Sequence, residues 1–193
     1  MDISFVAKTV VGVLAVAAAA TCGDYIWYTY GVRHTMTAGL VHGALLLTTV
    51  GAVLGAASGH VVKGLPIGAI AGIAGAATYY LLVMIMDRRT YGTAIPASWV
   101  IMWLILAVLD GRWLRAPARR TWTAVLVRGV AAALLGGIAF YLVLTTLWGR
   151  PPQGGRNYLV QFLAWSFAWA PGLLVLMWRD RLPATTVSHM RKV

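Results

Sequence analysis

The sequence predicts an all-α, polytopic integral membrane protein folded as a bundle of six transmembrane helices. The 193 residues are 60% hydrophobic, their mean hydropathy is +0.77, and only 11% are charged. A soluble domain carries about a quarter charged residues. Several apolar runs also approach the roughly 20 residues that an α-helix needs to cross a bilayer. At this length we expect a single domain.

Six hydrophobic spans follow one another along the chain, separated by short polar segments. They cover approximately residues 3–22, 36–59, 64–86, 94–109, 123–148 and 158–178, and residues 179–193 form a short basic tail. The first span has an alternative interpretation as a cleaved signal peptide. Asp2 and the single Lys8 make a poor positive flank for a signal peptide. We therefore favour a retained first helix.

The distribution of basic residues predicts the orientation of the bundle. Positive charge concentrates on the cytoplasmic side of a membrane, and a cytoplasmic N-terminus places most of the 16 Lys and Arg residues there. The outward-facing remainder is then Arg33, Arg88, Arg89, Arg150 and Arg156. We therefore predict a multi-pass protein of a bacterial inner (plasma) membrane with both termini cytoplasmic. Its expected partners are membrane lipids, which account for the net charge of +11 without nucleic acid.

Glycine recurs at a spacing of four in the stretch from Gly51 to Gly72. This spacing places residues on one slowly drifting stripe of an α-helix, and helices in lipid pack through small residues that let backbones approach. We predict a helical hairpin, closed at residues 60–63, that packs through Gly43, Gly51, Gly55, Gly59, Gly64, Gly68 and Gly72. The competing use of the stripe is self-association into a homo-oligomer, or docking into a larger membrane complex.

Residues that carry enzyme and cofactor chemistry are scarce. Cys22 is the single cysteine, which excludes an intrachain disulfide and a cysteine-based metal cluster. His42 and His60 are too far apart along one helix to share a metal ion, and no other span supplies a histidine for a haem. Motifs of metallohydrolases and serine hydrolases are absent. We predict no metal, no cofactor and no catalytic residue, which favours a non-enzymatic protein.

Polar and aromatic side chains within the spans are candidate ligand contacts. Trp165 and Trp169 lie near the middle of the sixth span, away from the membrane interface where tryptophan usually collects. Aromatic walls with a few polar groups suit a flat apolar ligand. The candidate ligand-binding residues are His42, Tyr79, Tyr80, Gln161, Trp165 and Trp169. The alternative is ordinary packing, with hydroxyl groups bonded to the helix backbone.

The segment from Gly23 to Thr35 is predicted to be an unusual loop after the first span. It is dense in aromatic residues and carries both charges and a histidine. It lies in the membrane interface as an amphipathic turn, or it caps the mouth of a cavity. The residues expected to form an outward-facing contact site are Asp24, Trp27, Arg33 and His34.

One short segment resembles a known family. Asp87 and Arg88 are followed by Trp99, an arrangement similar to that of Insig-type proteins. Those proteins are also small six-helix membrane proteins with both ends in the cytosol. The likeness covers only a small part of the chain, and what it implies is a lipid- or sterol-like ligand.

Three functions are compatible with these features. We favour a non-enzymatic membrane protein that binds or passes a small apolar or lipid-like molecule, because tryptophans lie within the spans and catalytic motifs are missing. The second is an accessory or scaffold subunit of a larger membrane complex, packed through the glycine stripe. The third is a lipid-modifying enzyme, in which polar residues, with His34 or His42 among them, converge at one interface.

Overall fold

A computed structural model describes residues 3–33, 35–86, 93–116, 119–143, 146 and 157–178. Within these ranges there is no strand, and the elements are α1 (Ile3–Thr29), α2 (Met36–Ser58), α3 (Val61–Ile85), α4 (Ala94–Leu109), the π-helical turn η2 (Asp110–Leu114), α5 (Trp122–Val143) and α6 (Tyr158–Met177). With η2 continuing α4, six helices are long and apolar enough to cross a membrane. The predicted all-α class with six such helices is confirmed, and the chain has the build of a multi-pass membrane protein.

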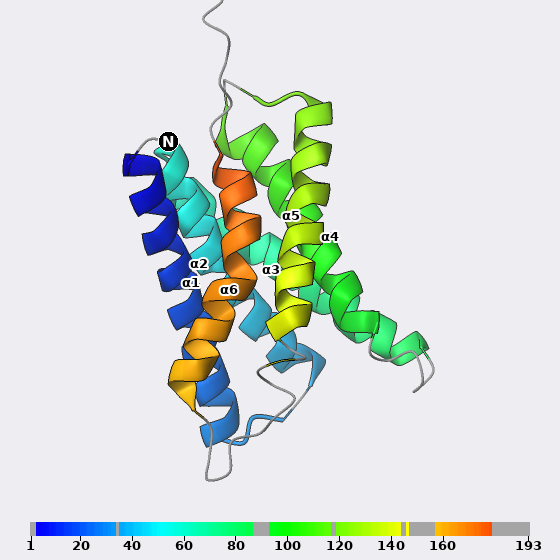
Figure 1. Cartoon of the computed structure of the whole chain (residues 1–193). Coiled ribbons are helices and arrows are strands. Elements are labelled where there is room, and N and C mark those ends of the chain that lie inside the picture. The colour runs from blue at the N-terminus through cyan, green and yellow to red at the C-terminus, as the bar shows by residue number, and fades with distance from the viewer. Residues whose placement is uncertain are drawn as a thin grey trace, which may run out of the picture.

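The six helices form a ring in which neighbours along the chain pack side by side (Figure 1). α1 closes the ring against α6, and the most extensive contact joins α2 to α3. The start of α1, the α2–α3 turn and the end of α6 lie at one end of the bundle, which we call the N-terminal end. The connection between α1 and α2 lies at the opposite end.

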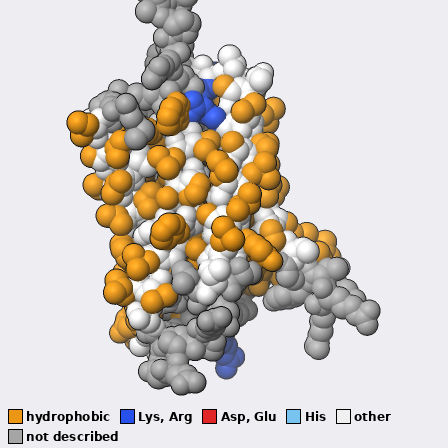
Figure 2. All heavy atoms as spheres, viewed as in Figure 1, with side chains coloured by type: hydrophobic (Ala, Val, Ile, Leu, Met, Phe, Trp, Pro, Cys, Tyr) orange, Lys and Arg blue, Asp and Glu red, His pale blue; other side chains and the backbone are white. Residues whose placement is uncertain are grey.

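Apolar side chains cover the flank of the bundle. Figure 2 shows them over its whole height, while the Lys and Arg side chains visible in that view lie toward the two ends. Leu45, Leu134 and Phe167 are examples of large apolar residues that are more than half exposed. An apolar surface of this extent suits lipid rather than water.

α1 is longer than the predicted span of residues 3–22. It continues to Thr29, so Asp24 and Trp27 belong to a helix rather than to the expected loop from Gly23 to Thr35. The helix ends where Gly31 takes a left-handed conformation with φ of 59°, and the Val32 N–H donates to the Trp27 carbonyl at 3.1 Å. A left-handed glycine just past the last turn is a common helix terminator. The extension places the Asp24 carboxylate in the wall of the bundle.

The turn between α2 and α3 is shorter than the predicted break at residues 60–63. Gly59 ends α2 with φ of 81°, and the His60 N–H donates to the Gly55 carbonyl at 2.6 Å. α3 already begins at Val61. Gly59 was predicted to pack against the facing helix, but a Cβ added there would meet no atom within 4 Å. Its role is the left-handed turn, which glycine adopts without steric cost.

The glycines of α2 and α3 meet across the hairpin. A Cβ added at Gly51 would overlap the backbone of Gly64 and Gly68, and one added at Gly68 would overlap the carbonyl of Leu47. An added Cβ would likewise meet backbone across the hairpin at four more glycines: Gly43, Gly55, Gly64 and Gly72. The two helix backbones are therefore closer than any larger residue would permit.

An ion cluster joins α4, α5 and α6 at the N-terminal end. Asp110 is fully buried, and its Oδ2 accepts hydrogen bonds from Arg115 Nε at 2.9 Å and Arg120 Nη1 at 2.7 Å. Arg120 and Arg128 also donate to carbonyls in the last turn of α6, those of Val175, Leu176 and Trp178. We call Asp110, Arg115, Arg120 and Arg128 the arginine cluster. Guanidinium groups satisfy the carbonyls that a helix end leaves without partners.

The last two predicted spans are described over most of their length. The fifth, residues 123–148, corresponds to α5 as far as Val143, and the sixth, residues 158–178, corresponds closely to α6. The predicted basic tail, residues 179–193, lies outside the described residues, as do Asp87 and Arg88 of the Insig-like segment.

Replacing Gly68 with alanine is expected to destabilise the bundle by about 1–3 kcal/mol, because the added methyl group overpacks a backbone contact. Gly137 of α5 offers a matched control, since a Cβ there meets only Trp99 Cδ1 at 3.7 Å, an ordinary contact. Gly137→Ala should be neutral, or stabilising by up to about 1 kcal/mol from helix propensity. Unfolding in mixed micelles with rising sodium dodecyl sulfate measures both. Equal stability of the two variants would contradict the close approach.

Asp110→Ala is expected to cost about 3–5 kcal/mol of unfolding free energy, because it strands buried guanidinium charge. The double replacement Asp110→Leu with Arg120→Leu should recover part of that loss, because it removes the more deeply buried of the two guanidinium partners and leaves Arg115, whose side chain is 18% exposed. The same unfolding titration compares the variants. A double variant that is no more stable than Asp110→Ala would show that the charge pairing is not what stabilises this end.

Candidate functional site

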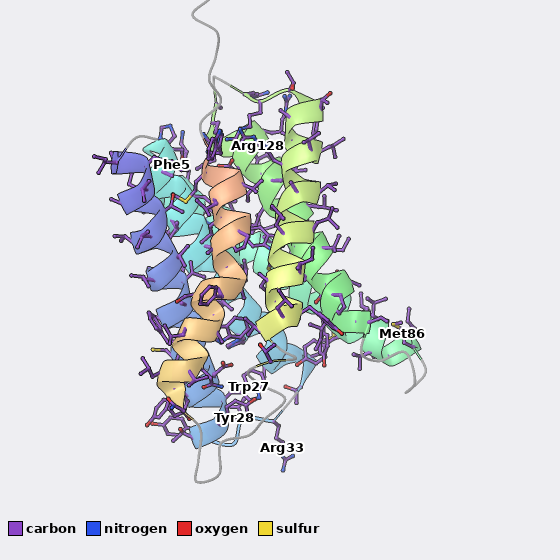
Figure 3. The ribbon with its side chains drawn as sticks, viewed as in Figure 1. Phe5, Trp27, Tyr28, Arg33, Met86 and Arg128 are labelled. Carbon is purple, nitrogen blue, oxygen red and sulfur yellow. The ribbon has the colours of Figure 1, made fainter. Side chains whose placement is uncertain are left out.

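A cavity of about 320 Å³ opens between α1, α2, α3 and α4 toward the end opposite the N-terminal end. Figure 3 places Trp27 and Tyr28 at this end, near Arg33, and Phe5 and Arg128 at the other. The polar and aromatic residues that line the cavity are Asp24, Trp27, Tyr28, His42, Tyr79, Tyr80, Ser98 and Trp99. We call this space the aromatic cavity. Asp24 is the only charged residue among its described lining residues.

Glycines make room for the aromatic cavity. Gly39, Gly43, Gly72 and Gly75 line it where α2 and α3 face each other and α4. The Tyr80 ring lies directly against Gly39, in space that any side chain on Gly39 would fill. The same small residues that bring α2 and α3 together therefore also leave a hollow beside them, into which the rings of α3 project.

Trp27 and His42 stand together at one wall of the cavity. Their rings meet edge to face with centroids 5.3 Å apart, a favourable geometry for an aromatic pair. The His42 imidazole also lies over Gly23 of α1, where an added Cβ would collide with it. A glycine at position 23 thus allows the half-buried imidazole to fit between α1 and α2.

Asp24 connects the cavity to α6. Its Oδ2 accepts a hydrogen bond from the Trp165 indole N–H at 2.8 Å. This contact exists because α1 remains helical through Asp24 and lies beside α6. A carboxylate within an apolar helix is costly, and such residues usually mark functional positions.

A second cavity, of about 560 Å³, lies on the other side of Trp27 and His42. It is formed between α1 and α2, and its walls are mainly apolar, with Ile26, Val41 and Leu45 among them. Cys22, the single cysteine, is exposed and also lines it. We call it the flank cavity. Trp27 and His42 line both spaces and form the partition between them.

Behind the aromatic cavity lies a cluster of rings that we call the aromatic core: Trp99, Trp103, Phe140, Trp165 and Trp169. Trp99 stacks on Phe140 at 4.8 Å and contacts Trp169 at 4.8 Å. Trp103 lies 5.5 Å from Trp169, and Phe140 lies 5.8 Å from Trp165. Trp99 belongs to both the cavity wall and the core, so it links the two.

The aromatic core carries polar atoms that have no partner among the described residues. The indole nitrogens of Trp99, Trp103 and Trp169 are buried without a hydrogen bond, and outside the aromatic core the same holds for Oε1 of Gln161. Buried polar groups of this kind each cost about 1–3 kcal/mol. Trp99, Trp103 and Trp169 are therefore held by ring packing and shape, whereas Trp165 also donates its hydrogen bond to Asp24.

The structure brings together five of the predicted contact residues and leaves others elsewhere. His42, Tyr79 and Tyr80 line the aromatic cavity, as do Asp24 and Trp27 of the predicted outward-facing site. Trp165 reaches the cavity through its bond to Asp24. Gln161 and Trp169 are buried in the bundle and line neither described cavity. Arg33 is exposed beyond the end of α1, and His34 lies outside the described residues.

Three polar or aromatic lining residues are missing from the predicted contact sites: Tyr28, Ser98 and Trp99. Tyr28 was assigned to a loop, and its place on α1 follows only once the helix is known to reach Thr29. Trp99 sits inside the fourth span at a spacing of four from Trp103, which signals a buried face. That spacing does not tell which neighbouring helix the face meets.

The arrangement is suited to binding. Rings from four helices surround a small space, and one carboxylate, one imidazole and several hydroxyl groups face it. In the part of the chain that the structure describes, no three His, Cys, Asp or Glu side chains gather as metal ligands would. Comparison with known proteins adds no assignment, because no family model, curated protein or solved structure matches the chain.

The bond between Asp24 and Trp165 is expected to couple the two residues by about 1.5–3 kcal/mol, the range for hydrogen bonds to charged groups. A double-mutant cycle of Asp24→Ala and Trp165→Phe, read by unfolding in mixed micelles, measures this coupling. Asp24→Ala combined with Trp178→Phe, at the N-terminal end, is the control, and its effects should simply add. Additive behaviour in the first cycle would exclude the bond as a stabilising contact.

Proposed function

We propose that this chain is a non-enzymatic membrane protein that binds or passes a small, largely apolar molecule through the aromatic cavity. The observation that carries the proposal is the convergence of Trp27, Tyr79, Tyr80 and Trp99 from three helices, with His42 from a fourth, around one space of about 320 Å³. Ligand pockets in proteins are of roughly this size or larger, about 300–1,000 Å³, and combine apolar walls with few polar groups.

The charge of the cavity refines the class of ligand. Asp24 supplies a carboxylate, and aromatic faces attract cations that they can surround. A flat or compact molecule with one positively charged or hydrogen-donating group therefore fits better than a purely hydrocarbon one. The flank cavity beside Trp27 and His42 offers an apolar approach from the side of the bundle, which supports entry from lipid.

The same proposal includes the membrane and the orientation. Six apolar helices support a multi-pass protein, and we place it in a bacterial inner membrane with both termini cytoplasmic. The charges support that orientation: Arg128 lies at the N-terminal end and Arg33 at the opposite end (Figure 3). The N-terminal end also carries Lys63 in the first turn of α3, Arg112 in η2 and Arg119 just before α5. The aromatic cavity then faces the outer side.

The other two functions are less well supported. The glycine stripe is used inside the chain, between α2 and α3, which removes the surface that a scaffold would need for docking through it. Asp24 and His42 do share one cavity, and this observation keeps a lipid-modifying enzyme as the second candidate. Such an enzyme would convert its bound molecule, whereas a binding protein releases it unchanged, and native mass spectrometry of incubated lipid extracts separates the two outcomes.

A matched pair of small probes tests the binding function. Phenyltrimethylammonium and tert-butylbenzene have nearly the same shape and differ by one positive charge. We expect the purified protein to bind both, and to bind the ammonium about 5- to 30-fold more tightly, as a cation–π site with a carboxylate contributes about 1–2 kcal/mol. Saturation-transfer NMR in an uncharged detergent measures the two affinities. Asp24→Asn should remove the preference but keep the binding of tert-butylbenzene.

Two serines provide the blocking variant and its control. Ser98 lines the cavity and bonds back to the Ile95 carbonyl, whereas Ser166 of α6 bonds back to the Phe162 carbonyl and lines neither described cavity. Ser98→Phe should abolish binding of both probes, and Ser166→Phe should not. If neither probe binds the wild-type protein, the proposed function is wrong. If both bind but Asp24→Asn keeps the preference, the cavity stands and the role of Asp24 is wrong.

A further inference from the structure

A third pocket lies at the N-terminal end, far from the aromatic cavity. It has a volume of about 310 Å³ and is lined by Val108, Leu109, Arg112, Trp113, Arg119 and Trp122. These residues come from the last turn of α4, the turn η2, and the start of α5 with the residues just before it. We call it the interfacial pocket. A role for it rests on the membrane insertion and orientation proposed above, but not on ligand binding in the aromatic cavity.

Arg112 is held in place at this pocket by groups that leave its charge uncompensated. Its guanidinium carbon lies 4.7 Å from the centre of the Trp122 ring, and its Nη1 donates to the Arg120 carbonyl at 2.9 Å. A cation over an indole face is fixed without losing its charge. The Arg120 carbonyl is itself positioned because the Arg120 N–H donates to the Gly111 carbonyl at 3.0 Å.

The basic residues of this end divide into two groups. Arg115 and Arg120 pair with Asp110, and Arg120 and Arg128 bond to the carbonyls of α6. Arg112 and Arg119 form no ion pair with any carboxylate in the described part of the chain. Both line the interfacial pocket. The first group holds helices together, and the second presents positive charge to an incoming group.

The walls of the pocket match the boundary between lipid tails and headgroups. Val108 and Leu109 end an apolar helix, while Trp113 and Trp122 are 62% and 55% exposed. Exposed tryptophan is typical of that boundary. Arginine is well suited to phosphate, because its planar guanidinium group donates two parallel hydrogen bonds. A molecule that satisfies the whole pocket has a negatively charged phosphate beside an apolar chain.

We propose that the interfacial pocket binds the phosphodiester headgroup of an anionic phospholipid, with Arg112 and Arg119 on the phosphate and Val108 and Leu109 beside the start of the acyl chains. Basic pockets on this side of membrane proteins are suited to such headgroups. Arg112 provides a preset contact, and the exposed Arg119, which lines the same pocket, supplies a second guanidinium group for the phosphate.

Native mass spectrometry in an uncharged detergent tests the site with two short-chain lipids, dioctanoyl phosphatidylglycerol and dioctanoyl phosphatidylcholine. The wild-type protein should retain phosphatidylglycerol in preference to phosphatidylcholine. Arg112→Gln combined with Arg119→Gln should weaken retention of phosphatidylglycerol by at least about tenfold, since each arginine near an anionic surface contributes a factor of about five. The control, Arg33→Gln with Lys63→Gln, removes the same charge from exposed positions outside the pocket and should retain the lipid.

The single replacement Arg119→Gln distinguishes loss of the lipid contact from loss of folding. The residue is exposed and forms no hydrogen bond with another described residue, so Arg119→Gln should leave the melting temperature unchanged and weaken retention about fivefold. Retention of phosphatidylglycerol by both arginine variants at the wild-type level would overturn the proposal. So would an equal loss in the control, which shows general attraction. Displacement of the lipid by excess inorganic phosphate alone would show a free-phosphate site and overturn the lipid assignment.

Discussion

The approach of α2 to α3 is the constraint on which the rest of the bundle depends. In lipid no hydrophobic force drives helices together, so their association relies on close packing of the surfaces that they present. Here the backbones of Gly51, Gly64 and Gly68 touch, with no side chain between them. The ring is completed around this hairpin, with α1 packed on α2, α4 packed on α3, and α6 returning to α1. The spacing set by glycine thus fixes where the side chains of His42 and Tyr80 enter the space between the helices.

The two described carboxylates of the bundle lie in different surroundings. The arginine cluster takes the fully buried Asp110 and surrounds it with guanidinium groups that also close the end of α6. A buried pair of this kind adds little net stability over apolar packing, but breaking it is costly. Its value is that it fixes how α4, α5 and α6 meet. Asp24, in contrast, faces an aromatic space, and its Oδ2 accepts a hydrogen bond from the indole N–H of Trp165.

Much of the fold follows from the sequence, because the lengths of apolar runs and the spacing of glycines are local properties. The six helices were predicted within a few residues at most ends. The end of α1 was not, because Gly23 and Asp24 look like the start of a loop, while the real terminator is the left-handed Gly31. Gly59 fits the fourfold spacing of the stripe, yet its backbone conformation gives it a different role.

The candidate site was only partly predictable, for a physical reason. Helical spacing tells which residues share a face, but not which helix that face meets. Trp165 and Trp169 share a face of α6, but Trp165 reaches Asp24 while Trp169 packs against Trp99 and Trp103. The cavity collects a few residues from each of four helices. Such a set is defined only by the packing of the ring, which no local pattern encodes.

The two ends of the bundle differ in how firmly they are held. At the N-terminal end α2 and α3 are joined by the Gly59–His60 turn, and the arginine cluster ties α4, α5 and α6. At the opposite end the last part of α3 leads to Met86, which lies away from Trp27 and Tyr28 (Figure 3). In mechanical terms, the ties described at the cavity end include contacts between single side chains, such as Asp24 with Trp165 and Tyr25 with Tyr158. A substitution at the cavity therefore alters its walls without touching the turn and the arginine cluster that join the helices at the other end.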